Sequence, residues 1–128
     1  MKILIVDDSS TNLMLLRAIT ERLDDVEIAS CSEPLVALDM LREGTYDLIL
    51  VDYVMPQMNG NELIRAIRLL EDYRGVPVVM ITGEGNRQVR LEAISAGATD
   101  FLNKACRPHR IAGAAHQPAG PATRATRS

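Results

Sequence analysis

The chain has 128 residues, of which 47% are hydrophobic and 24% are charged, as is usual for a single globular domain. With no tryptophan, 3% aromatic residues and a net charge of −3, we expect neither base stacking nor polyanion binding, and therefore no direct contact with nucleic acid. No apolar run is long enough to span a membrane, and the first apolar run is too short for a signal peptide. Cys31 and Cys106 form no CxxC motif, so we expect reduced thiols and a cytoplasmic location.

Short apolar runs alternate with longer segments of helical periodicity along the first 104 residues. Strands are predicted at Ile3–Val6, Val26–Ala29, Leu48–Val51, Val76–Ile81 and Phe101–Leu102. Helices are predicted near residues 10–23, 33–43, 60–71 and 87–96. Alternation of strands and helices at this spacing indicates an α/β fold, with an open, doubly wound parallel sheet covered on both faces.

Local signals mark where several of these helices begin and end. Ser32 is expected to cap the second helix, and Pro34 falls in its first turn, where a missing N–H does no harm. Gly44, Gly75 and Gly97 lie where helices are expected to end. These signals support the predicted order of elements.

Apolar residues of the predicted helices fall on definable faces. Leu63, Ile67 and Leu70 share one face of the third helix, and Leu91 and Ile94 share one face of the fourth. The first helix carries more apolar residues than one face needs, namely Leu13, Met14, Leu15, Leu16, Ile19 and Leu23. We therefore expect self-association through the first helix, or a domain of marginal stability.

Polar residues follow the predicted strands at the ends that share one edge of the sheet. Strand 1 ends in Asp7 and Asp8, strand 3 in Asp52, strand 4 in Thr82, and strand 5 near Lys104. Since the carboxyl ends of neighbouring parallel strands meet at one edge, these side chains are expected to converge, and ligands bind at such edges.

Three carboxylates in one place repel one another, and a hard divalent cation relieves the repulsion. Mg²⁺ suits one or two carboxylates together with a carbonyl and phosphate oxygens. With Mg²⁺ on one side and Lys104 on the other, Asp52 stays ionised and can act as a nucleophile in phosphoryl transfer.

Four stretches together carry a family resemblance: "ILIVDDS", "LILVDYVMPQMNG", "VVMITGEG" and "AGATDFLNK". They resemble the receiver domain of two-component response regulators, of the chemotaxis-regulator type, over residues 2 to about 104. The resemblance implies a flavodoxin-like fold with strand order 2-1-3-4-5. It also implies a signalling domain that promotes only its own phosphorylation and dephosphorylation, and not an enzyme acting on other substrates.

The resemblance implies roles for the metal and phosphoryl ligands. Asp52 would accept a phosphoryl group from a histidine kinase or a phosphotransfer protein. Asp8 would bind Mg²⁺ directly, Asp7 would assist through water, and the backbone carbonyl of Val54 would be a further metal ligand.

Three further residues match positions that sense the phosphoryl group in this family. Thr82 would bind one phosphoryl oxygen and Lys104 another. Phe101 matches the aromatic switch position, which turns inward when Thr82 moves. The surface of the fourth helix and fifth strand would then change for a downstream output protein or for an output domain since lost.

Residues 105–128 differ from the rest of the chain and from the family. They contain four arginines and no acidic residue, whereas all 17 acidic residues lie in the first 104. The family places a fifth amphipathic helix here. We expect a receiver domain over 1–104, followed by an Ala/Arg/Pro-rich tail with a short helix near 108–116, so that the fifth helix is short or missing.

Other protein classes fit the residues less well. An aspartate-nucleophile phosphatase places a second acid two residues after the nucleophile, and here that position is Val54. A flavin-binding electron carrier needs a phosphate-cradling loop and aromatic residues over the ring, and aromatic residues are scarce. The alternative that stays open is a receiver-like interaction module that works without phosphorylation.

Overall fold

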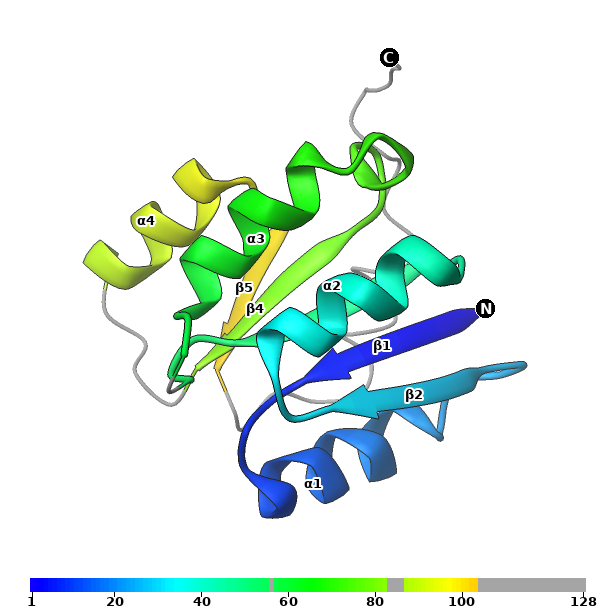
Figure 1. Cartoon of the computed structure of the whole chain (residues 1–128). Coiled ribbons are helices and arrows are strands. Elements are labelled where there is room, and N and C mark those ends of the chain that lie inside the picture. Colours follow the sequence, from blue (N-terminus) through cyan, green and yellow to red (C-terminus); the bar gives the residue numbers. More distant parts are fainter. Residues whose placement is uncertain (56, 83–86, 104–128) are drawn as a thin grey trace.

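Five parallel strands form one sheet in the computed structural model, which describes residues 1–55, 57–82 and 87–103. The strands are β1 (Lys2–Val6), β2 (Glu27–Cys31), β3 (Leu48–Asp52), β4 (Val78–Thr82) and β5 (Asp100–Asn103). The helices are α1 (Ser10–Thr20), α2 (Pro34–Glu43), α3 (Gly60–Leu69), the short 3₁₀ helix η1 (Glu71–Tyr73) and α4 (Arg87–Ala96). The strand order is β2-β1-β3-β4-β5 (Figure 1), which confirms the predicted doubly wound fold.

The sheet separates two apolar layers. Helices α2, α3 and α4 lie on one face of the sheet and α1 lies on the other (Figure 1). Alternate residues of β1 enter the two layers: Leu4 and Val6 join the larger cluster, and Ile3 and Ile5 join the smaller one. All five residues of β3 are buried, as expected for a central strand of a parallel sheet.

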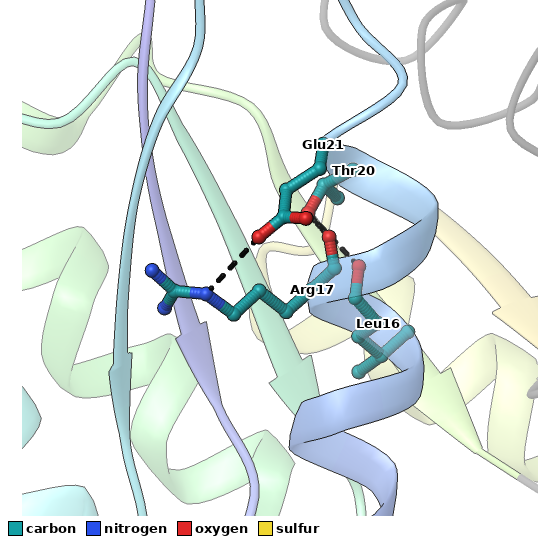
Figure 2. Close-up of polar contacts among 4 residues, drawn as sticks. All are labelled: Leu16, Arg17, Thr20 and Glu21. Atoms are coloured by element: carbon teal, nitrogen blue, oxygen red, sulfur yellow. Dashed lines mark hydrogen bonds and ion pairs between the residues drawn. The ribbon is translucent and has the colours of Figure 1, made fainter.

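Helix α1 ends at Thr20, three residues before the predicted end. The Thr20 hydroxyl lies 2.9 Å from the Leu16 carbonyl oxygen and 3.1 Å from that of Arg17, and it donates to this pair (Figure 2). After Thr20 the chain forms a tighter turn of the 3₁₀ type, in which the Leu23 N–H donates to the Thr20 carbonyl oxygen three residues back. On the exposed side, Arg17 forms an ion pair with Glu21. A threonine that bonds back to the preceding turn weakens continuation of the helix.

The start of α2 differs from the prediction by one residue. Glu33, and not Ser32, is the N-cap residue, and its side chain makes no capping hydrogen bond. Pro34 is the first helical residue, as predicted. Because its ring already holds a helical φ angle, the helix begins directly at Pro34 and leaves Ser32 one position too early to cap it. At the other end, Gly44 caps α2 and donates its N–H to the Met40 carbonyl oxygen.

The predicted apolar face is buried in α3 but exposed in α4. In α3, Leu63 and Ile67 are fully buried, and Leu70, which follows the helix, packs against the core. In α4, Leu91 and Ile94 do share a face, but they are 53% and 45% exposed. The buried residues of α4 are small or β-branched, namely Val89, Ala93 and Ala96. Of the helices that the structure describes, none is both long and apolar enough to cross a membrane.

Tyr73 ties η1 to the end of α2. Its side chain is buried, and its hydroxyl oxygen lies 2.8 Å from the Leu41 carbonyl oxygen and 2.7 Å from the Gly44 carbonyl oxygen. The hydroxyl therefore donates to carbonyls at the carboxyl end of a helix, where intrahelical donors are lacking. Burial raises the pKa of Tyr73 above its ordinary value.

We expect Tyr73→Phe to lower the free energy of unfolding by about 1–2 kcal/mol, because one buried and one partly buried carbonyl lose their shared donor. Since the folded-state pKa is raised, the hydroxyl stabilises the fold fully below about pH 10 and loses this effect as pH rises through the folded pKa. Urea unfolding at neutral pH and above pH 10 measures both effects. Tyr53→Phe is the control, and an equal loss of stability in both variants would contradict the assignment.

Candidate functional site

The register of the sheet brings the polar strand ends level with one another. Val6 of β1 pairs with Val51 of β3, and the residues that follow these two valines are Asp7 and Asp52. Asp52 in turn pairs with Ile81, and Thr82 is the next residue of β4. The predicted convergence of these residues at one edge of the sheet therefore follows from strand pairing.

Three carboxylates meet at this edge. Asp7, Asp8 and Asp52 each offer an oxygen atom, and these atoms lie within 4.8 Å of one another. Asp7 is 0% exposed and Asp52 is 3% exposed, whereas Asp8 is exposed. The Ser9 N–H donates to Asp7 Oδ1 over 2.9 Å and fixes the position of that carboxylate. The three oxygens form a donor set of the hard, anionic kind that Mg²⁺ prefers, open to solvent on the Asp8 side.

The other predicted site residues lie in different surroundings. Thr82 is buried at the end of β4. Val54 follows β3 with its side chain 65% exposed, and the role expected of it concerns its backbone carbonyl. Phe101 of β5 is 8% exposed and belongs to the larger apolar cluster, so it already points inward. Its role as a switch stays a prediction.

Several predictions fall on residues outside the described part of the chain. Lys104 is one of them, although it directly follows Asn103, which pairs with Thr82 in the sheet. The tail of residues 105–128, the short helix near 108–116 and the fate of the fifth helix also lie outside the described residues.

Gly60 sets the distance between α3 and the strand that carries Asp52. A Cβ atom on Gly60 would lie 2.7 Å from the Asp52 carbonyl oxygen and 2.8 Å from Met80 Cε. The Gly60 N–H also donates to the Tyr53 carbonyl oxygen over 2.8 Å, which closes the loop after β3. Any side chain here would push α3 away from the site. Gly60 ends the stretch "LILVDYVMPQMNG", which carries part of the family resemblance, but the sequence alone does not reveal this close approach.

The first turn of α3 is held by a reciprocal cap that sequence reasoning missed. The Glu62 N–H donates to Asn59 Oδ1 over 2.9 Å, and the Asn59 N–H donates to Glu62 Oε1 over 3.1 Å. The spacing of a capping side chain and a glutamate three residues later was the available signal. The cap fixes where the loop from Asp52 enters α3.

Comparison with known proteins establishes the family. The sequence model of the response regulator receiver domain matches residues 3–116. The chain therefore belongs to the response regulator receiver family, which acts in two-component signalling. Among its relatives is the chemotaxis protein CheY of Pseudomonas aeruginosa, which is 38% identical over 104 residues, covering 81% of this chain and 84% of CheY.

Two further relatives show the range of proteins that carry this domain. The cyclic di-GMP phosphodiesterase response regulator RpfG of Xanthomonas campestris is 37% identical over 112 residues, which span 87% of this chain but 30% of RpfG. The receiver domain of a sensor histidine kinase from Pseudomonas aeruginosa was solved with a magnesium ion coordinated in its active site cleft. Its structure matches with a TM-score of 0.81 and 25% identity, covering 93% of this chain and 97% of that one.

Proposed function

We propose that Asp52 accepts a phosphoryl group from a histidine kinase or a phosphotransfer protein in the cytoplasm. The observation that carries this proposal is the cluster of carboxylate oxygens from Asp7, Asp8 and Asp52 within 4.8 Å at the end of β3. An oxygen of Asp52 would attack the phosphorus and form an acyl phosphate. The bond from phosphorus to the donor histidine nitrogen would break, and that nitrogen would keep the electron pair.

Asp7, Asp8, Asp52 and the backbone carbonyl of Val54 would hold Mg²⁺. Asp8 is the exposed member of the cluster and would bind the ion directly, while the buried Asp7 would act through water. When bound, Mg²⁺ supplies positive charge beside the transferring group. The magnesium ion in the Pseudomonas sensor kinase receiver, a structure of the same fold, supports this choice of cofactor.

Thr82 and Lys104 would complete the phosphoryl site. The hydroxyl of Thr82, next to the residue that pairs with Asp52, would donate to one phosphoryl oxygen. The ammonium of Lys104 would pair with another oxygen and offset its charge. These contacts stabilise the phosphoryl group on the domain itself, so the domain is a signalling phosphoacceptor and turns over no other substrate.

The proposal also assigns an output surface to α4 and β5 and a self-association surface to α1. Movement of Thr82 and Phe101 would change the surface of α4 and β5 for an output protein or for an output domain, such as longer response regulators carry. On the opposite face of the sheet, Met14 and Leu15 of α1 are 73% and 49% exposed, and we propose that they support self-association.

Phosphoryl transfer to the wild-type chain tests the proposal. The protein would be incubated with phosphoramidate, whose P–N bond matches that of phosphohistidine, or with acetyl phosphate, each with Mg²⁺ or with EDTA. Intact mass spectrometry should show a gain of one phosphoryl group in Mg²⁺ and none in EDTA. Absence of any gain in Mg²⁺ with both donors would favour the alternative, an interaction module that works without phosphorylation.

We expect Asp8→Ala to weaken Mg²⁺ binding by at least about tenfold, because the exposed carboxylate of the cluster is lost. Phosphorylation by acetyl phosphate should fall with it. Titration calorimetry measures the affinity, and Asp24→Ala removes the same charge from an exposed position away from the cluster. Wild-type phosphorylation rates in Asp8→Ala would show that Asp8 is not a metal ligand.

A further inference from the structure

Asn61, the second residue of α3, carries a polar group that its position does not explain. Its side chain is 5% exposed, and the buried amide oxygen Oδ1 accepts no hydrogen bond from any residue that the structure describes. Such oxygens are uncommon in folded proteins, because burial without a donor is costly. The other buried side chains of α3 are apolar, namely Leu63, Ile64 and Ile67. An apolar residue would therefore suit this position better in the resting fold.

Helical periodicity places Asn61 on the side of α3 that packs against α4. Asn61 and Arg68 are seven residues apart and so lie on the same side of α3, about two turns from one another. Arg68 Nε donates to the carbonyl oxygen of Gly97, directly after α4, over 2.9 Å. Since α3 and α4 lie side by side and run in the same direction (Figure 1), the start of α3, which carries Asn61, lies beside the start of α4.

The first turn of α4 is also connected to the phosphoacceptor edge. Asn61 follows Gly60, whose backbone approaches the Asp52 carbonyl oxygen, and α4 begins five residues after Thr82. A contact between Asn61 and the start of α4 would therefore connect the two strand ends that carry Asp52 and Thr82. The first turn of a helix presents backbone N–H groups without intrahelical acceptors. At the start of α4, those of Arg87 and Gln88 are the candidate donors for an amide oxygen.

We propose that Asn61 is a positioning residue of the phosphorylation switch, an inference that rests on the proposed phosphorylation of Asp52. In the resting fold the unpaired Oδ1 destabilises the α3–α4 contact. When Thr82 moves toward the phosphoryl group, the start of α4 shifts and a backbone N–H reaches Oδ1. The new hydrogen bond favours the phosphorylated arrangement, so the residue raises the population of that arrangement when the phosphoryl group is bound.

The test compares wild type, Asn61→Leu and Asn61→Ala by urea unfolding in Mg²⁺, with and without beryllium fluoride, a mimic of the phosphoryl group on a carboxylate. Stabilisation by beryllium fluoride gives its apparent affinity for the folded protein. In both variants we expect this affinity to fall by about tenfold, whatever the change in the stability of the free protein. Asn61→Ala keeps the test valid if the larger leucine strains the contact.

Thr20→Val is the control, because it alters a buried hydroxyl of α1 on the other face of the sheet and should leave the affinity unchanged. If Asn61 has only a structural role, the substitutions change the stability of the resting and of the phosphorylated arrangement equally. Unchanged affinity for beryllium fluoride in the two Asn61 variants would therefore overturn the inference. A wild-type protein that gains no stability from beryllium fluoride would instead overturn the proposed function, and this inference with it.

Discussion

We expect replacement of Asp52 with asparagine to abolish the Mg²⁺-dependent gain of a phosphoryl group from acetyl phosphate. The amide of asparagine has nearly the shape of the carboxylate but is a poor nucleophile, so the reaction loses its attacking oxygen. Because Asp52 is 3% exposed at the end of a fully buried strand, a substitution of equal size keeps the fold. Intact mass spectrometry, with Asp24→Asn as the control, measures the effect.

The same variant should be more stable than wild type in Mg²⁺-free buffer, by about 1–2 kcal/mol, since one of three clustered negative charges is removed. This gain in the free energy of unfolding also shows that the variant is folded. A phosphoryl group that still appears on Asp52→Asn would mean that another residue is the acceptor.

Arg68→Ala should cause the largest loss of stability among the substitutions considered. Arg68 Nη1 donates to the carbonyl oxygens of Tyr73 over 2.6 Å and Val76 over 2.7 Å, and Nη2 donates to Thr99 Oγ1 over 3.1 Å. With the bond from Nε to Gly97, the guanidinium joins the end of α3 to the loop before β4 and the turn before β5. Burial lowers the pKa of Arg68, and no described carboxylate forms an ion pair with it.

We expect this truncation to lower the free energy of unfolding by about 3–4 kcal/mol, because several partly buried acceptors lose a charged donor at once. Arg68→Lys should fall between wild type and Arg68→Ala, since an ammonium lacks the planar fork that reaches all these acceptors. Urea unfolding measures both variants, with Arg65→Ala on the exposed side of α3 as the control. A change within about 0.5 kcal/mol for Arg68→Ala would show that the bonds contribute little.

Much of the fold and of the candidate site could be predicted from the sequence, because both depend on short-range patterns. Apolar runs such as Leu48–Val51 mark buried parallel strands, and the residue that ends each run must lie at the shared edge. That rule alone predicts that Asp7, Asp52 and Thr82 lie together.

The remaining features depend on contacts that short patterns do not encode. The roles of Arg68 and Tyr73 are not visible in the sequence, because most of their partners are backbone oxygens, five to 32 residues away, whose positions are set by the path of the chain. Helical periodicity places Leu91 and Ile94 on one face of α4. The helix nevertheless buries the face with the smaller Val89 and Ala93, because these side chains allow it to pack closely. The buried Asn61 has no periodic signature at all.

The hydrogen bonds of Arg68 also determine which substitutions at its partner positions leave the bonds intact. Two of its acceptors are the main-chain oxygens of Tyr73 and Val76, which every amino acid carries, so replacement of those side chains leaves the acceptors in place. Gly97 is different, because it has a φ of +117° and a Cβ there would lie 2.8 Å from Arg68 Cγ. Analysis of correlated substitutions would therefore pair Arg68 with Gly97 and Thr99, and would miss the two shortest bonds that the guanidinium makes.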